Sequence, residues 1–222
     1  MLQAVIFDMD GVIMDSEPIH YDTEFEILKD FGVHEYPVEE HSKYVGMRTR
    51  DLWEGHIQKY GLSSSIQELT LKGDEAYIDR LRTGSFDPIA GVVDLIERLY
   101  QAGVKMIVAS SASRENIKLV LDKFAIGNFF EGYVSSQDVE RTKPNPDIFL
   151  LAAKKLDVDP AHCVVIEDAK HGVQAAISAG MKCIGYKNPN SGNQDLSKAD
   201  LTLESHNNID LKLLENLTID AL

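Results

Sequence analysis

The chain has 222 residues, a length that suits one large domain or one domain with a smaller one inserted. Apolar residues make up 44% of it, enough for a sizeable buried core. The formal net charge of −14 argues against nucleic acid or an anionic membrane as the main partner, because both require a basic surface. An anionic small molecule would need a local cation to hold it.

Further features narrow the class of protein. The N-terminal apolar run is too short for a signal peptide, and no segment approaches the length of a membrane span. We therefore expect a cytoplasmic monomer with a small-molecule partner. Cys163 and Cys183 both lie in apolar runs and are interpreted as buried free thiols, with a disulfide as the alternative.

The first predicted element is a short buried strand formed by the apolar run of residues 4–7. Asp8 and Asp10 follow it, and Gly11 then allows a sharp turn. Side chains two residues apart on an extended backbone share a direction, so both carboxylates would face one point at the end of the strand. Such a pair suits a divalent cation and phosphoryl chemistry. The alternative is a polar turn without a function.

The next region, from about residue 16 to 82, predicts helices and almost no strands. Apolar residues recur at helical spacing in three runs, and glycines end two of them. Ser65 with Glu68 three residues later is a capping-box pattern for the third helix. The runs contain Tyr21, Phe25 and Leu28 before Gly32, then Trp53, Ile57 and Tyr60 before Gly61, then Tyr77 and Leu81. A compact helical subdomain over residues 15–83 is the interpretation.

Beyond residue 84, short apolar runs alternate with amphipathic helices. The predicted strands cover residues 104–109, 130–135, 162–166, 181–186 and 199–203, and helices are predicted in most of the intervals between them. This alternation is typical of a parallel sheet with both faces covered by helices. The predicted fold class is therefore α/β: a Rossmann-like parallel sheet core over residues 1–14 and 84–222, with an inserted α-helical cap over residues 15–83.

Polar clusters follow four of these strands. Because sites in parallel sheets gather at the carboxyl ends of the strands, we expect the four clusters to lie at one edge. Each has a simpler explanation alone, since serines and acidic residues cap helices and lysines are usually solvated. The clusters are Asp8 with Asp10, Ser110 with Ser111, the segment 141–146 with Lys143, and Glu167 with Asp168.

These motifs resemble those of the haloacid dehalogenase superfamily of phosphohydrolases over nearly the whole chain. The matching residues are Asp8-Met9-Asp10-Gly11, Ser110 after Ile107-Val108-Ala109, Lys143-Pro144-Asn145-Pro146-Asp147, and Ile166-Glu167-Asp168-Ala169. The inserted helices resemble the helical cap of that family. Within it, the chain is similar to the β-phosphoglucomutase-like and sugar-phosphate phosphatase branch.

The resemblance implies a role for each core residue. Asp8 would be the nucleophile that forms an aspartyl-phosphate, and Asp10 would move protons to and from the leaving oxygen and water. Lys143 would offset negative charge. Ser110, Ser111 and the backbone N–H groups up to Ala112 would bind phosphate oxygens. Mg²⁺ would be held by Asp8, the Asp10 carbonyl and Asp168, with Glu167 acting directly or through water.

Substrate choice would lie in the cap. The resemblance implies that His20 and the loop containing Gly46, Arg48 and Arg50 meet the substrate, although His20 could equally be an ordinary surface histidine. In the mutases one arginine of this loop grips the second phosphate of the sugar. By gapless matching Thr49 takes that position here, between two arginines, and Gly73 takes the position of a mutase lysine, next to Lys72.

The expected function is a magnesium-dependent phosphatase acting on a small phosphorylated metabolite, with a sugar phosphate as the expected substrate. Two alternatives stay open. One is a β-phosphoglucomutase that interconverts β-glucose 1-phosphate and glucose 6-phosphate. The other is a non-catalytic protein that binds phosphorylated metabolites on the same fold.

Overall fold

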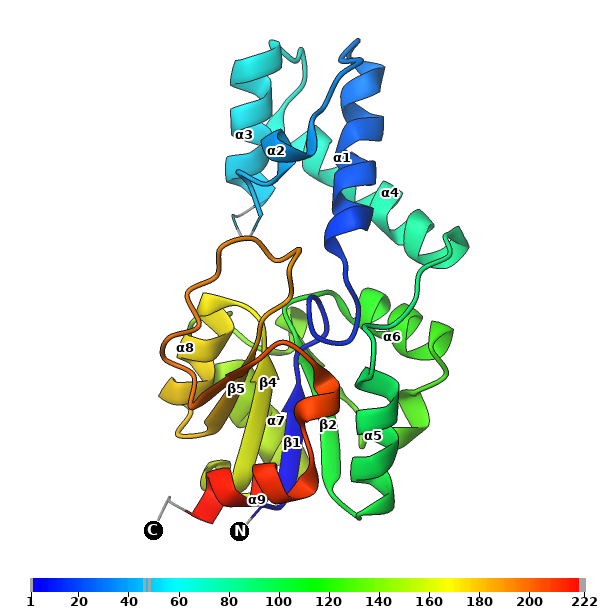
Figure 1. Cartoon of the computed structure of the whole chain (residues 1–222). Helices are drawn as coiled ribbons and strands as arrows, with labels where there is room; N and C mark the ends of the chain where they lie inside the picture. Colours follow the sequence, from blue (N-terminus) through cyan, green and yellow to red (C-terminus); the bar gives the residue numbers. More distant parts are fainter. Residues whose placement is uncertain (1, 46, 48, 220–222) are drawn as a thin grey trace. The chain divides into compact units, whose positions relative to one another are not determined.

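The computed structural model describes residues 2–45, 47 and 49–219 (Figure 1). The chain divides into two compact units. One comprises Met1–Asp15 with Asp87–Leu222, and the other comprises Ser16–Phe86. We call them the sheet unit and the helical unit.

The sheet unit is built on a six-stranded sheet in the order β3-β2-β1-β4-β5-β6, in which all neighbours are parallel. The order runs one way from β1 and the other way from β4, so the topological switch point lies between these two strands. The strands are β1 (Ala4–Phe7), β2 (Lys105–Ser110), β3 (Tyr133–Ser135), β4 (Cys163–Glu167), β5 (Lys182–Tyr186) and β6 (Leu201–Leu203). The predicted α/β class with a Rossmann-like parallel sheet is confirmed.

The two central strands are buried along their whole length. Val5 of β1 is in register with Met106 of β2 on one side and with Val164 of β4 on the other. Helices cover both faces, and for this reason the strands read as continuous apolar runs rather than alternating ones.

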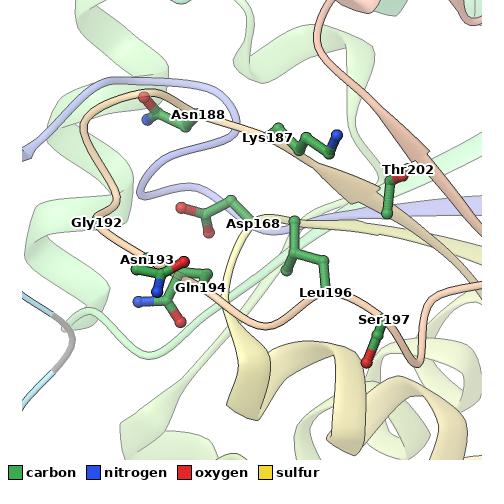
Figure 2. A pocket seen from close by; sticks show the side chains of 9 residues that line it. All are labelled: Asp168, Lys187, Asn188, Gly192, Asn193, Gln194, Leu196, Ser197 and Thr202. Carbon is green, nitrogen blue, oxygen red and sulfur yellow. The ribbon is translucent and has the colours of Figure 1, made fainter.

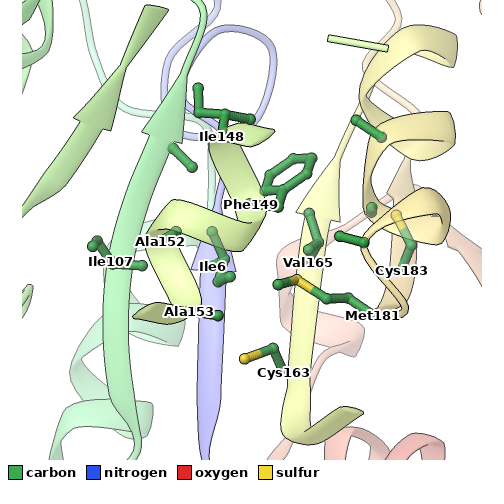
Figure 3. Close-up of a cluster of buried hydrophobic side chains, with 14 of the residues drawn as sticks. Ile6, Ile107, Ile148, Phe149, Ala152, Ala153, Cys163, Val165, Met181 and Cys183 are labelled. Atoms are coloured by element: carbon green, nitrogen blue, oxygen red, sulfur yellow. The ribbon is translucent and has the colours of Figure 1, made fainter. Parts of the chain in front are cut away.

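Helices α7 (Asp147–Leu156) and α8 (Lys170–Ser178) form the apolar core on one face of the sheet. Figure 3 shows Phe149 of α7 packed among side chains of the strands, including Ile6 and Val165. Helices α5 (Val92–Gln101) and α9 (Leu211–Ile219) lie in front of the sheet in Figure 1, with α7 behind it. Helix α6 (Arg114–Lys123) packs near β3.

The helical unit contains α1 (Glu17–Asp30), α2 (Val38–His41), α3 (Thr49–Tyr60) and α4 (Ile66–Thr83). Its own core is separate from that of the sheet unit and centres on Leu28, Trp53 and Leu69. Helix α4 begins where the capping pattern predicts, because the Ser65 hydroxyl accepts the Glu68 N–H at 3.2 Å.

Some elements differ from the sequence prediction. The strand predicted over 130–135 is confined to Tyr133–Ser135, because a 3₁₀ turn over Gly127–Phe129 precedes it. The last strand begins at Leu201, and just before it the Asp200 carboxylate accepts the Cys183 N–H at 2.8 Å. Helix α9 was not predicted. Cys163 and Cys183 are buried free thiols, as predicted. Of the helices in the described part of the chain, none has the length and apolar character that a bilayer crossing requires.

Candidate active site

The carboxyl end of β1 places Asp8 at the switch point. Its N–H donates to the Ile166 carbonyl of β4 at 3.0 Å, so the backbone continues in sheet register one residue beyond the strand. The Asp8 side chain is buried, with 6% of the residue exposed. A charged group in this position requires partners, because burial of an isolated carboxylate is costly.

Lys143 supplies one partner. It comes from the loop between β3 and α7, and its Nζ lies 2.5 Å from Asp8 Oδ1, 2.9 Å from Glu167 Oε1 and 3.2 Å from the Ala109 carbonyl. Burial alone would lower the pKa of Lys143, but the charges of Asp8 and Glu167 raise it well above its usual value. The lysine is therefore held as an ammonium ion that joins the ends of β1, β2 and β4.

Three carboxylates converge beside this ammonium ion. Oxygens of Asp8, Glu167 and Asp168 all lie within 4.8 Å of one another, and all three residues are buried. Burial, together with the charges of Glu167 and Asp10, raises the pKa of Asp8 to about 8, although Lys143 acts in the opposite direction. Burial and the charges of Glu167 and Asp8 also raise the pKa of Asp168. One ammonium ion thus leaves negative charge uncompensated.

This donor set fits a hard divalent cation. Carboxylate oxygens are what Mg²⁺, Ca²⁺ and Mn²⁺ accept, and a cation would offset the charge that Lys143 does not. The Asp10 side chain is not part of the group of three.

Two glycines leave room for two of these carboxylates. A Cβ atom on Gly172, in the first turn of α8, would lie 1.6 Å from Glu167 Oε1. A Cβ atom on Gly11, where φ is +77°, would lie 1.9 Å from Asp168 Oδ2. No side chain fits at either distance, so the acidic groups occupy space that only glycine provides.

The end of β2 brings Ser110 to the same edge. Its buried hydroxyl accepts the Ala112 N–H at 3.0 Å and lies 3.4 Å from Asp10 Oδ2. Ser113 is the residue that caps α6, since its hydroxyl accepts the Asn116 N–H at 3.2 Å. Neither Ser110 nor Ser111 caps that helix, and Ser111 is exposed. All four polar clusters predicted at the strand ends therefore belong to the sheet unit.

Comparison with known proteins identifies the family. The family model described as haloacid dehalogenase-like hydrolase matches residues 5–186. The chain belongs to this family. It is 32% identical to β-phosphoglucomutase of Bacillus subtilis (strain 168), over 96% of this chain and 94% of that protein. It is 30% identical to the fructose-1-phosphate phosphatase YqaB of Escherichia coli (strain K12), over 83% of this chain and 96% of that protein.

A solved structure shares the fold of this haloacid dehalogenase-like chain. It is CbbY from Rhodobacter sphaeroides in complex with xylulose-(1,5)bisphosphate, with a TM-score of 0.82 at 24% identity over 96% of this chain and 99% of that one. The family, the parallel-sheet fold and the enzyme class expected from the motifs are thereby established: the chain is a haloacid dehalogenase-family phosphohydrolase or phosphoglucomutase.

The substrate-binding residues predicted in the cap all belong to the helical unit. His20 of α1 stacks on Tyr77 of α4, with ring centroids 4.4 Å apart and planes 10° apart, inside the helical unit. Arg50 lies exposed in the first turn of α3. Gly46 and Arg48 lie outside the described residues. The part that these four residues play toward a substrate stays a prediction.

The sequence did not reveal three residues that lie around the carboxylates Asp8, Glu167 and Asp168. They are Gly172, Asn188 and Ser191. The Ser191 hydroxyl hydrogen-bonds to Asp168 Oδ2, and Asn188 Nδ2 donates to the Gly11 carbonyl at 3.3 Å. Gly172 left one signal, because a glycine inside a helical pattern usually has a packing reason. Asn188 and Ser191 lie in an irregular loop, where no periodicity points to a contact.

That loop also forms one wall of a pocket of about 430 Å³ beside Asp168 (Figure 2). Polar and apolar surface contribute about equally to the lining: amide and hydroxyl side chains contribute to it, and Leu196 adds an apolar patch. The lining residues are Asp168, Lys187, Asn188, Gly192, Asn193, Gln194, Leu196, Ser197 and Thr202.

Proposed function

We propose that this haloacid dehalogenase-like enzyme is a magnesium-dependent phosphatase that hydrolyses a small phosphorylated metabolite, namely a sugar phosphate, through an aspartyl-phosphate on Asp8. One observation carries the proposal: buried Asp8 lies against Lys143 and within a group of three carboxylates at the switch point. A nucleophile, a fixed positive charge and oxygen ligands for a cation are thus adjacent.

The first chemical step belongs to Asp8 and Asp10. A carboxylate oxygen of Asp8 forms a bond to phosphorus while the bond from phosphorus to the substrate oxygen breaks. Asp10 donates a proton to the departing oxygen, so the alcohol leaves neutral. The contact of Ser110 with Asp10, at 3.4 Å, supports the placement of the Asp10 carboxylate beside the segment of residues 110–112 that would bind the phosphate.

The second step regenerates Asp8. Asp10, now a carboxylate, takes a proton from water as the water oxygen attacks phosphorus, and the bond between phosphorus and Asp8 breaks to release inorganic phosphate. Lys143 stays charged throughout and offsets the negative charge on Asp8 and the transferring group. When bound by Asp8, Asp168, Glu167 and the Asp10 carbonyl, Mg²⁺ supplies the charge that lets an anionic phosphoryl group approach these carboxylates.

The choice of a sugar phosphate is supported by the relatives, which are named for fructose 1-phosphate and phosphoglucose. A mutase is the second candidate, because the relative of that name covers 96% of this chain. The phosphatase is preferred because Gly73 takes the mutase lysine position, and a Cβ atom added there would meet Trp53 of the same unit at 3.5 Å. The neighbouring Lys72 lies over the Phe31 ring, with Nζ 5.6 Å from the centroid.

Phosphate release tests the proposal. The full chain is incubated with Mg²⁺ and a panel of sugar phosphates, and free phosphate is measured. We expect turnover of at least one sugar phosphate, and a fall in kcat of roughly 10³-fold or more in Asp8→Asn, because the nucleophile is lost. Asp122→Asn makes the same change at an exposed site on α6 and should leave kcat unaltered.

A parallel assay separates the alternatives. It follows the conversion of β-glucose 1-phosphate to glucose 6-phosphate with glucose 1,6-bisphosphate as primer. Fast isomerisation with negligible phosphate release would replace the phosphatase by the mutase. Binding of a sugar phosphate without either reaction would favour the non-catalytic alternative.

A further inference from the structure

Asp168 of the acidic group is held by a residue from a distant loop. Ser191, in the segment between β5 and β6, donates its hydroxyl hydrogen to Asp168 Oδ2. Both residues are buried, Ser191 with 7% and Asp168 with 6% of the residue exposed. Water therefore has little access to this hydrogen bond, and a bond to a buried carboxylate is stronger than a neutral one.

The loop that carries Ser191 is fixed on two sides. Toward the turn after β1, Asn188 Nδ2 donates to the Gly11 carbonyl at 3.3 Å, and the Ser191 N–H donates to the Asn188 carbonyl at 3.3 Å. Toward α8, Gln194 Nε2 donates to the Ser191 carbonyl at 3.0 Å and Gln194 Oε1 accepts the Lys170 N–H at 3.1 Å. Figure 2 shows this segment running round Asp168. The hydroxyl is therefore presented from a tethered backbone.

Asp168 has a reason to need such a tether. Its neighbours Asp8 and Glu167 carry the same charge, and Lys143 donates to those two carboxylates, not to Asp168. Its Oδ2 sits where a Cβ on residue 11 would be, 1.9 Å away, so the rotamer that Ser191 selects exists only because Gly11 is present. A carboxylate has two oxygens, and the one that accepts from Ser191 leaves the other for a cation.

We propose that Ser191 is a positioning residue for the cation site: its hydroxyl holds the Asp168 carboxylate so that one oxygen is directed to the metal. This inference rests on the proposed function through the metal site, but not on the identity of the substrate. Residues that orient metal ligands typically contribute about 10- to 100-fold to metal affinity, a range that the experiment can resolve.

The test compares Mg²⁺ binding by titration calorimetry in the full-length wild type, Ser191→Ala and Ser191→Thr. Ser178→Ala is the matched control, since it removes a hydroxyl that bonds Gln174 at the exposed end of α8. We expect Ser191→Ala to weaken Mg²⁺ binding by about 10- to 100-fold. Ser191→Thr, which keeps the hydroxyl, should recover most of the affinity, and Ser178→Ala should bind as the wild type does.

Kinetics give a second readout. With the wild-type substrate, Ser191→Ala should raise the Mg²⁺ concentration for half-maximal rate in proportion to its loss of affinity, while kcat at saturating Mg²⁺ stays close to the wild-type value. A fall in kcat at saturation with unchanged Mg²⁺ affinity would overturn the inference. So would equal affinity for Mg²⁺ in wild type and Ser191→Ala.

A folding defect would be recognised separately. If Ser191→Ala does not fold, Ser191→Cys replaces it, because the thiol keeps the volume but is a weak donor; the same loss of affinity is expected, and wild-type affinity would contradict the inference. Absence of phosphate release in a wild type that binds Mg²⁺ would reject the phosphatase proposal alone. Absence of Mg²⁺ binding in the wild type would overturn the metal site and this inference with it.

Discussion

Gly172 lies in the first turn of α8 against the Glu167 side chain, which accepts hydrogen bonds from Lys143 at 2.9 Å and from the Ala169 N–H at 2.7 Å. An alanine in a helix normally gains about 1 kcal/mol over glycine. Here the added Cβ would lie 1.6 Å from Glu167 Oε1, so the carboxylate would have to leave its position. The free-energy cost of this steric overlap should exceed the gain from the higher helix propensity of alanine.

We therefore expect Gly172→Ala to destabilise the sheet unit by about 1–3 kcal/mol, the usual range for overpacking, and to weaken Mg²⁺ binding. Urea unfolding followed by circular dichroism and Mg²⁺ titration measure the two effects. The matched control is Gly73→Ala in α4, where the added Cβ would meet Trp53 at an ordinary 3.5 Å. That variant should be as stable as the wild type or more so. Equal behaviour of the two variants would show that Glu167 can move without cost.

At the scale of residues, the sequence predicts those site residues whose neighbours along the chain form a recognisable pattern. Asp8, Ser110 and Glu167 each follow an apolar run, and the rule for parallel sheets places strand ends together without knowledge of side chains. Ser191 has no such context, because its contact with Asp168 spans 23 residues and depends on how an irregular loop folds back. A contact of this kind depends on the folded conformation of the loop, which a local sequence pattern does not describe.

At the scale of elements, three helices of the helical unit are joined by buried polar groups. Glu24 Oε2 of α1 accepts from the Tyr36 hydroxyl at 2.7 Å and lies 2.8 Å from His41 Nδ1 of α2. His56 Nε2 of α3 lies 3.1 Å from the same tyrosine hydroxyl, and His41 Nε2 lies 3.2 Å from Glu17 Oε2. A four-residue helix such as α2 is too short to be stable alone, so this network holds it in place.

The network should make the helical unit sensitive to pH. Burial alone would lower the pKa of His41, but hydrogen bonds with Glu17 and Glu24 raise it to about 9. Burial alone would raise the pKa of Glu24, but bonds from His41, His56 and Tyr36 lower it to about 2. The folded chain thus holds the His41 proton more tightly than the unfolded chain, whose histidine has a pKa near 6.5.

It follows that the His41 contribution is complete below pH 6.5 and is lost as the pH rises from 6.5 to 9, while the Glu24 contribution is lost as the pH falls from 4.5 to 2. We expect the free energy of unfolding of the wild type to exceed that of His41→Ala by an amount that shrinks by on the order of 2 kcal/mol between pH 6 and pH 9.5. Trp53 is the only tryptophan of the chain and is buried in this unit, so its fluorescence in urea reports the transition.

The control for that series is His34→Ala, a histidine of the same unit with an exposed side chain. Its difference from the wild type should be small and should not change with pH. A difference between wild type and His41→Ala that stays constant from pH 6 to pH 9.5 would contradict the assigned charge of His41.

Helices and strands, like single residues, could be predicted only where the local sequence carries a pattern. Helix α4 could be predicted from its Ser65 cap, and the central strands from apolar runs that both faces of the sheet bury. Helix α2 was missed because its reason to exist is the buried bond of His41 to α1, which lies 17 residues away. An element that depends on tertiary contacts of polar residues could thus not be predicted where helix propensity and hydrophobic spacing are weak.

At the scale of the whole molecule, two explanations exist for any stabilisation by Mg²⁺. The chain carries a net charge of −14, so every added salt relieves general repulsion. A cation bound by Asp8, Glu167 and Asp168 would add a term that only the folded chain provides. Relief of general repulsion should not depend on which cation is added or on any single carboxylate. Stabilisation by a bound cation should depend on both.

We expect Mg²⁺ to raise the melting temperature of the wild type above that in NaCl of equal ionic strength, and EDTA to remove the difference. Binding at ten times Kd stabilises by about 1.4 kcal/mol, which corresponds to roughly 3–6 °C for a chain of this size. Asp168→Asn removes one of three like charges within 4.8 Å, so it should be no less stable than the wild type without metal and should lose most of the extra shift. Asn193→Ala, a change in the same pocket wall but outside the acidic group, should keep the shift. If NaCl reproduces the full effect of Mg²⁺, or if Asp168→Asn retains it, the stabilisation arises from the net charge of the molecule and not from a cation held at the switch point.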